Sequence, residues 1–329
     1  MRGIISRFAP APTGFLHLGH VVNAAAVWGE TRAAGGRILL RIEDHDRTRS
    51  RPEYEAAILE DLAWLGFAAD GPPVRQSERD EIYVEALDTL RRQGLVYACA
   101  CSRAEIVAAR AALKGCATDR ETDVAQASTA ADEGQASRAA DVAQAFRSAD
   151  AGQAFKAAGV GQASRAPDVA QAFRPADAEL CYPGTCRDRG LTEGPGLGLR
   201  VRIAPSIERF VDRRLGPQQQ RPSEQCGDLL VRDRDRNWTY QFAATVDDFV
   251  QGVTLVVRGV DLLPSTGRQI QLARLLGRAE PPAFLHHGLI MKSADQKLSK
   301  SDGDTGIREL RAAGWAPGDV IARALSLVE

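Results

Sequence analysis

The sequence has no long hydrophobic run and no strong excess of charge of either sign. None of its apolar stretches approaches the ~18 residues that a membrane span needs. The start of the chain, MRGIISRFAP, lacks the apolar centre and the small-residue cleavage site of a signal peptide. The formal net charge of -1 argues against a wholly basic nucleic-acid-binding protein but not against a local basic face. We therefore expect a cytoplasmic protein that has no membrane partner.

Cysteine is also scarce, with six among 329 residues, and four of the six fall in two close pairs. In a cytosolic chain of this length, clustered cysteines indicate a metal or redox site more often than disulfides. Cys116 and Cys226 have no motif around them, and we assign them no role. The apolar share of 44% is ordinary for a globular protein, so one large or two modest domains can fold without cross-links.

The order of the predicted elements indicates an α/β fold. Apolar runs predict the strands, and helical segments closed by Gly or opened by Pro lie between them. Early in the chain we expect strands at 3–8 and 37–44 and helices at 18–34, 51–67 and 78–94. Later we expect strands at 199–203, 228–232 and 253–258, a helix at 264–276, and two short helices after residue 304. Strands that alternate with helices predict a doubly wound parallel sheet.

A repeat of nine residues interrupts this pattern between 123 and 174. Each copy carries Gln, then Ala, then Ser or Phe, from Gln126 to Gln171. Nine residues make two and a half helical turns, so successive Phe positions would face opposite sides of a helix. We interpret about 120–176 as a low-complexity insertion, disordered or loosely helical, that carries none of the chemistry.

The stretch RFAPAPTGFLHLGH, from Arg7 to His20, joins the first strand to the first helix. A Gly-rich and Pro-rich turn before a helix exposes backbone N–H groups beside the positive end of the helix dipole, which suits a phosphate. His17 and His20 flank Gly19, so both imidazoles can face the start of the helix and donate hydrogen bonds to phosphate oxygens. The alternative is a capped helix with two surface histidines.

A second candidate phosphate loop, KLSKS, lies far downstream at 297–301. It offers Lys297 and Lys300 in a short polar loop that could close over a polyphosphate. Taken alone, a solvated basic turn is the simpler interpretation. The two motifs in this order across an α/β domain favour a nucleotide-binding enzyme.

HLGH and KLSKS resemble the HIGH and KMSKS signatures of class I aminoacyl-tRNA synthetases. RFAPAPTGFLHLGH, RIEDHDRTRS (41–50) and 237–272 resemble the glutamyl-tRNA synthetase branch. The resemblance implies a Rossmann-type catalytic domain with an inserted zinc-binding subdomain and a short helical C-terminal end. It divides the chain into a first catalytic half (1–98), the zinc-binding insertion (99–190), a second catalytic half (191–301) and a helical tail (302–329).

The resemblance also implies roles for individual residues. His17, His20 and Lys300 would be catalytic, and ATP would contact His17, Gly19, His20, Lys297 and Lys300. L-Glutamate would contact Arg7, Phe8, Ala9, Pro10, Ala11, Glu43, Tyr240 and Arg258. Without the resemblance, the residues favour blander roles: an ion pair of Glu43 with Arg41 or Arg47, and a half-buried strand aromatic for Tyr240.

Only 28 residues follow Ser301, too few for the anticodon-reading region of a full glutamyl-tRNA synthetase. The resemblance therefore points to the truncated branch, the glutamyl-Q tRNA(Asp) synthetases. Such an enzyme activates L-glutamate with ATP and Mg²⁺ and transfers it to the queuosine of tRNA(Asp). The alternatives are a shortened synthetase that charges the tRNA 3′ end, an adenylyltransferase with an H-x-G-H turn, and a silent nucleotide-binding module. We expect a monomer.

The cysteine pairs fit the structural zinc site that the resemblance implies. Cys99 and Cys101 would provide two thiolates, and Tyr182 and Cys186 the third and fourth ligands. Cys181 is the rival of Tyr182 because a thiolate is the more usual zinc ligand. The two halves are 80 residues apart, which a looped-out insertion allows because the cost of loop closure grows slowly with length. For the tRNA backbone, the candidate contacts are Arg187, Arg189, Arg213 and Arg214.

Overall fold

The computed structural model describes residues 3–114, 181–293, 296–297 and 306–328. The nine-residue repeat, Cys116 and Lys300 lie outside the described residues. Lys297 is described in its backbone only.

The first strands of the chain form a parallel sheet. Its strands are β1 (Ile5–Phe8), β2 (Arg37–Ile42) and β3 (Val74–Arg75), with β2 in the middle. Ile5 lies opposite Arg37, and Arg41 lies opposite Val74. The connections are α1 (Leu18–Ala33) and α2 (Pro52–Trp64), which begins with Pro52 as its sequence predicts.

The second half continues this sheet. Strands β9 (Leu255–Gly259), β10 (Ala283–His287) and β6 (Glu208–Asp212) run parallel, and β7 (Gly216–Gln220) pairs antiparallel with β6. β9 lies next to β1, where the Thr254 N–H donates to the Ile5 carbonyl at 2.8 Å. The strand order is therefore β3-β2-β1-β9-β10-β6-β7. The strand ends that carry Phe8, Gly259 and His287 consequently share one edge.

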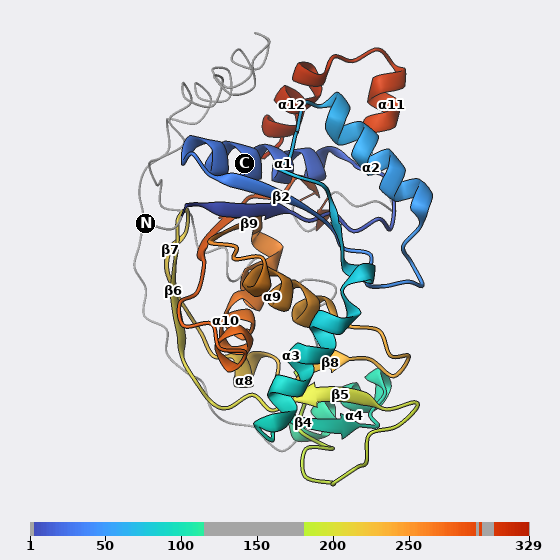
Figure 1. Ribbon diagram of the computed structural model, residues 1–329, viewed down its shortest axis with the longest axis vertical. Helices are drawn as coiled ribbons and strands as arrows, with labels where there is room; N and C mark the ends of the chain where they lie inside the picture. The colour runs from blue at the N-terminus through green and yellow to red at the C-terminus, as the bar shows by residue number, and fades with distance from the viewer. Residues whose placement is uncertain (1–2, 115–180, 294–295, 298–305, 329) are drawn as a thin grey trace.

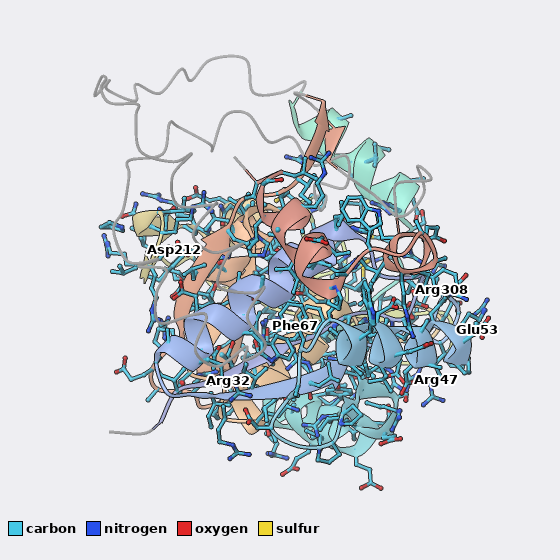
Figure 2. The ribbon with its side chains drawn as sticks, turned by 90° about the horizontal axis from the view of Figure 1, so that it is seen from above. Arg32, Arg47, Glu53, Phe67, Asp212 and Arg308 are labelled. Atoms are coloured by element: carbon cyan, nitrogen blue, oxygen red, sulfur yellow. The ribbon has the colours of Figure 1, made fainter. Side chains whose placement is uncertain are left out.

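Helices cover both faces of this sheet (Figure 1). On one face lie α1, α2 and the two terminal helices α11 (Ile307–Ala312) and α12 (Pro317–Leu325); on the other lie α9 (Tyr240–Val250) and α10 (Thr266–Leu275). The first face is sealed by a core in which Val27, Ile38 and Val320 are completely buried. Figure 2 looks down on it and places Arg308 of α11 at the same end as Glu53 of α2. The predicted doubly wound fold is confirmed.

A smaller antiparallel sheet lies beyond α9. It consists of β4 (Val96–Cys99), β5 (Gly198–Val201) and β8 (Leu229–Arg232), with β5 in the middle. α3 (Asp80–Arg92) and α9 pack against it through a second core that includes Tyr83 and Phe242. The remaining elements are α4 (Arg103–Lys114), α8 (Pro222–Gln225), β11 (Met291–Ser293), β12 (Gln296–Lys297) and two 3-10 helices at Gln76–Glu78 and Val260–Ser265.

The elements expected from the sequence appear within a few residues of their predicted bounds. α9 was not expected, and Tyr240 is its first residue rather than part of a strand. β10 was also missed, because its last two residues, His286 and His287, end the apolar run that announces a buried strand. Over the described ranges, no helix has both the length and the apolarity required to cross a membrane.

Candidate active site

The HLGH turn holds its two imidazoles in place by capping α1. His17 is the N-cap residue, and its Nδ1 accepts from the Gly19 N–H at 3.1 Å. The Nδ1 of His20 accepts from the His17 N–H, also at 3.1 Å, and the ring centroids are 4.0 Å apart. Because both Nδ1 atoms accept, each neutral ring carries its proton on Nε2. The helix is capped, as the simpler interpretation expected, and the capping bonds themselves orient the rings.

Gly19 is required by this packing. A Cβ there would lie 2.9 Å from Cε1 of His17, closer than real Cβ contacts come. The segment that follows the KLSKS loop also returns to this turn: His17 and Gly306 form an antiparallel bridge, and the Ile307 N–H donates to the Leu16 carbonyl at 3.0 Å. Gly306 and Ile307, which follow the second motif in the sequence, thus contact the first motif.

Arg7 and Arg41 share one carboxylate, 13% exposed, beside the ends of β1 and β2. Asp248 of α9 accepts from Nε of Arg7 at 2.9 Å and from Nη1 of Arg41 at 2.7 Å. Burial alone would raise the pKa of Asp248, but the two guanidinium groups lower it to about 2. Arg41 is fully buried and also contacts Glu43 at 3.2 Å and Asp247 at 3.7 Å. Sequence reasoning missed both aspartates.

Glu43 follows β2 and is 7% exposed. Its backbone N–H donates to the Pro10 carbonyl at 3.0 Å, which ties the RFAPA segment to the end of β2. Burial raises the pKa of Glu43, while Arg41, His45 and Arg7 oppose that rise. The ion pair with Arg41 that the residues alone favoured is present, and it leaves the carboxylate beside Arg7.

The residues expected to bind glutamate converge on this edge of the sheet. Burial and the neighbouring Glu43 raise the pKa of Tyr240, while Arg258 and Arg7 lower it, so all four groups interact electrostatically. Arg258 lies on β9 and is 3% exposed. Phe8 is an exception, because its ring is 1% exposed and packs against Trp28 in the core, at 5.6 Å between ring centroids. Only the backbone of Phe8, and not its ring, could therefore contact glutamate.

The four predicted zinc ligands also lie together, at the end of β4. The Sγ atoms of Cys99, Cys101 and Cys186 lie within 4.8 Å of one another. The hydroxyl of Tyr182 is 3.5 Å from Sγ of Cys99 and 3.9 Å from Sγ of Cys101. Sulfur ligands 2.3 Å from a tetrahedral ion lie about 3.8 Å from each other, so these donors fit Zn²⁺ in number, type and spacing.

Cys181, the rival ligand, points elsewhere. Its thiol donates to the Glu224 carbonyl at 3.4 Å. Tyr182 is held inward by a hydrogen bond from its backbone N–H to the Cys226 carbonyl at 2.9 Å. A Cβ at Gly227 would overlap the Tyr182 carbonyl oxygen, so this close approach requires glycine.

Hydrogen bonds favour a thiolate at Cys186. Burial opposes ionisation, but donors that include the Ala100 N–H lower the pKa of Cys186 to about 7. By contrast, burial raises the pKa of Cys101 to about 11. The cluster therefore holds one thiol that ionises near neutral pH without help and one that needs a cation to do so.

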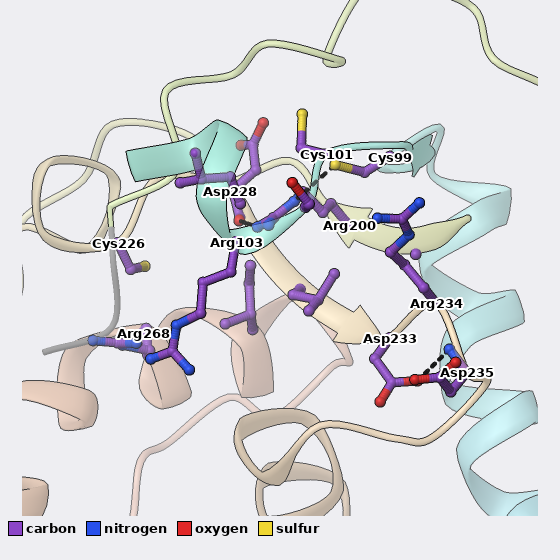
Figure 3. Close-up of a pocket in the computed structure, with 15 residues that line it drawn as sticks. Cys99, Cys101, Arg103, Arg200, Cys226, Asp228, Asp233, Arg234, Asp235 and Arg268 are labelled. Atoms are coloured by element: carbon purple, nitrogen blue, oxygen red, sulfur yellow. Dashed lines mark hydrogen bonds between the residues drawn. The ribbon is translucent and has the colours of Figure 1, made fainter. Parts of the chain in front are cut away.

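A pocket of about 470 Å³ opens beside this cluster. Figure 3 shows the side chains of Cys99 and Cys101 at one end and Asp233 and Asp235 at the other. The charged side chains that line it are Arg103, Arg200, Arg234 and Arg268, with Asp228, Asp233 and Asp235. Four cations against three carboxylates leave little net charge, so the lining does not by itself select an anion.

The arginines expected to contact tRNA are partly engaged within the protein. Arg187 donates two hydrogen bonds to the buried Asp228 carboxylate, at 2.5 and 2.7 Å. Arg189 donates to Sγ of Cys186 at 3.8 Å, and Arg213 lies 3.9 Å from Glu30. Arg187 thus supports the cysteine-bearing subdomain rather than standing clear of it.

Comparisons with known proteins identify the family to which the chain belongs. The family model for the catalytic domain of class I tRNA synthetases (E and Q) matches residues 3–150 and 188–326. A glutamyl-Q tRNA(Asp) synthetase of Rhodobacter capsulatus is 36% identical, over 96% of this chain and 98% of its own. One of Bordetella bronchiseptica is 40% identical, over 91% of this chain and 75% of its own.

A solved structure supports the same fold. The glutamate-tRNA synthetase of Elizabethkingia anophelis aligns over 100% of this chain and 67% of its own, with a TM-score of 0.63 and 23% identity. At that identity the likeness concerns the fold alone. Together with the family model and the curated relatives, it shows that the chain belongs to the class I tRNA synthetases, in the glutamyl-Q tRNA(Asp) synthetase family.

Proposed function

We propose that this protein activates L-glutamate with ATP and transfers the glutamyl group to the queuosine of tRNA(Asp). In the first step the α-carboxylate of glutamate attacks the α-phosphorus of ATP, and the bond to pyrophosphate breaks. In the second step a hydroxyl of the queuosine cyclopentenediol attacks the acyl carbon, and AMP leaves. We place the protein in the cytoplasm, together with the ATP, L-glutamate and tRNA that this reaction uses.

The observation that supports the proposal is the electrostatic interaction of Arg7, Glu43, Tyr240 and Arg258 at one edge of the sheet. Glutamate bears two carboxylates and one ammonium group. Two buried guanidinium groups complement the carboxylates, and the Glu43 carboxylate complements the ammonium. Binding the ammonium would also favour the ionised form of Glu43, whose pKa burial raises.

His17 and His20 supply the electrostatic part of the first step. Their Nε2–H groups can donate to phosphate oxygens, where negative charge develops as the carboxylate attacks. The rings are fixed before ATP binds, because their Nδ1 atoms already cap α1. Lys297 and Lys300 remain the proposed contacts of the triphosphate, and Mg²⁺ is its expected counter-ion.

The zinc ion is proposed as structural. Cys99, Cys101, Tyr182 and Cys186 provide four ligands and no open position, the arrangement of a structural zinc site. The ion would replace the hydrogen bonds that now join these groups and hold β4 to the segment at 181–186. Zinc content per chain, measured by atomic emission, tests this assignment.

The decisive experiment has two stages. ATP–pyrophosphate exchange without tRNA, run with glutamate, glutamine and aspartate, should respond to glutamate. After a reaction with queuosine-containing tRNA(Asp), mass analysis of nuclease digests should find glutamate on queuosine. Glutamate on the terminal adenosine would establish the shortened synthetase instead. A stable adenylylated product without tRNA would establish an adenylyltransferase. The absence of any ATP–pyrophosphate exchange would establish a silent nucleotide-binding module.

A further inference from the structure

The buried guanidinium of Arg258 is held by neutral partners. Its Nε donates to Nε2 of His286 at 3.0 Å, its Nη1 to Oε1 of Gln269 at 2.7 Å and its Nη2 to Oγ1 of Thr266 at 2.8 Å. In the described part of the chain no carboxylate forms an ion pair with it. A group that is 3% exposed therefore keeps its positive charge without direct neutralisation.

A buried carboxylate, that of Asp212, contacts the opposite side of the His286 ring from Arg258. Oδ2 of Asp212, at the end of β6, lies 2.7 Å from Nδ1 of His286 and accepts from the His286 backbone N–H at 3.1 Å. Its Oδ1 accepts from the backbone N–H groups of Arg214 and Leu215 at 3.0 and 2.9 Å. Burial opposes ionisation of Asp212, but these donors lower its pKa below the ordinary value. Asp212 is therefore an acceptor.

These bonds determine the tautomer of His286. An ionised Asp212 accepts, so Nδ1 of His286 must donate. Nε of Arg258 donates, so Nε2 of His286 must accept. The imidazole is consequently neutral and carries its proton on Nδ1. His286 itself is completely buried, and no water is needed to satisfy either nitrogen.

We propose that Asp212 and His286 are positioning residues for glutamate binding: they form a neutral relay that orients Arg258 toward the substrate and leaves its charge available. This inference rests on the proposed function of Arg258 in binding glutamate. A carboxylate placed directly on Arg258 would compete with the substrate carboxylate for the guanidinium. A neutral imidazole fixes Nε without that competition, and Asp212 fixes the imidazole in the tautomer that accepts.

Two substitutions of His286 separate the halves of the relay. His286→Asn places an amide near the position of Nδ1, so it can still donate to Asp212 but does not reach Arg258. His286→Gln places an amide oxygen near the position of Nε2, so it can accept from Arg258 without Asp212. We expect His286→Asn to raise the KM for glutamate about tenfold or more and His286→Gln to restore most of it. The KM for ATP and kcat should change little, because the lost contact is uniform binding.

Asp212→Asn removes the carboxylate that favours the Nδ1–H tautomer of His286. An amide nitrogen facing Nδ1 would favour the Nε2–H form, whose proton would oppose the Arg258 donor, so the KM for glutamate should again rise about tenfold. The matched control is Glu208→Gln, on the same strand. Glu208 is 1% exposed and pairs with Arg274, and among the described residues it forms no hydrogen bond or ion pair with Arg258 or His286. It should lower thermal stability and leave the KM for glutamate unchanged.

The tautomer can be observed without relying on activity. The chain has five histidines, and His286→Asn identifies the signals of His286 in a ¹⁵N spectrum of the imidazoles. A protonated Nδ1 in the wild type, switching to Nε2 in Asp212→Asn, supports the relay. A protonated Nε2 in the wild type overturns it, as does a glutamate KM that Glu208→Gln raises as much as Asp212→Asn. A wild type with the Nδ1–H tautomer but no glutamate-dependent exchange refutes the proposed function and the substrate role of the relay, while the geometry stands.

Discussion

Replacing Asp248 with Asn should cost both stability and glutamate binding. The substitution keeps the shape of the side chain and removes the charge that Arg7 and Arg41 share at 2.9 and 2.7 Å. Arg41 is completely buried and retains Glu43 and Asp247, but Arg7 loses the one carboxylate that holds its Nε. Breaking a buried ion pair from one side costs about 3–5 kcal/mol.

That free energy corresponds to a fall in Tm of about 6–20 °C for a domain of this size. Urea denaturation gives the change in the free energy of unfolding, and pyrophosphate exchange gives the KM for glutamate, which should rise because Arg7 is no longer fixed. The control is Asp188→Asn. Asp188 also pairs with an arginine, Arg202, at 2.9 Å, but its side chain is 80% exposed, so the loss should stay within about 0.5 kcal/mol.

The pH dependence provides a second check. The pKa of Asp248 is lowered from 3.8 to about 2, so its contribution is complete above pH 4 and is lost as the pH falls toward 2. The part of the stability difference that depends on pH is about 2 kcal/mol, and the remainder of the roughly 3–5 kcal/mol is independent of pH. The stability gap between wild type and Asp248→Asn should therefore be constant from pH 7 to 5 and narrow below pH 4. A gap below 1 kcal/mol at pH 7, or one that widens in acid, would refute the shared-carboxylate argument.

Three further predictions address the other parts of the site. Gly19→Ala should change stability by less than about 1 kcal/mol, because better helix propensity offsets a weakened His17 cap, yet it should reduce pyrophosphate exchange by displacing the His17 ring. Unchanged exchange would contradict the role of the capping bond. Tyr182→Phe should lower zinc retention against a chelator, whereas Cys181→Ala should not; the reverse result would make Cys181 the ligand. Deleting residues 120–176 should leave zinc content and exchange nearly unchanged, and loss of either would show that the repeat contributes.

Much of the fold could be predicted from local patterns. The apolar runs of β1, β2 and β9 and the Gly and Pro boundaries of α1 and α2 are sequence signals that act within a few residues. The HLGH turn was found for the same reason, since its capping bonds span only three residues. The grouping of Arg7, Glu43 and Arg258 did not follow from local patterns and came from the resemblance to glutamyl-tRNA synthetases; for Glu43 alone, the rule that parallel strands end at one edge also favoured a ligand site.

The partners of these residues could not be predicted in that way. Asp248 and Arg41 are 207 positions apart, and His286 and Asp212 are 74 apart. The residues DDF at 247–249 do not themselves indicate whether their carboxylates lie on the surface of a helix or at the centre of an ion-pair network. α9 was missed for a related reason: Gln241, Thr245 and Asp247 are buried on it, so its apolar residues do not form a single stripe.

The contrast between local sequence patterns and long-range contacts also applies to β10. A strand that ends in two histidines is a poor apolar run, and it can be buried because tertiary partners satisfy each ring. His287 bonds the Asn23 side chain of α1, and His286 bonds Arg258 and Asp212. One strand end thus contacts the helix that the HLGH turn begins and the arginine proposed to bind glutamate. The two histidines that hide β10 from sequence patterns are therefore the residues that connect it to α1 and to Arg258.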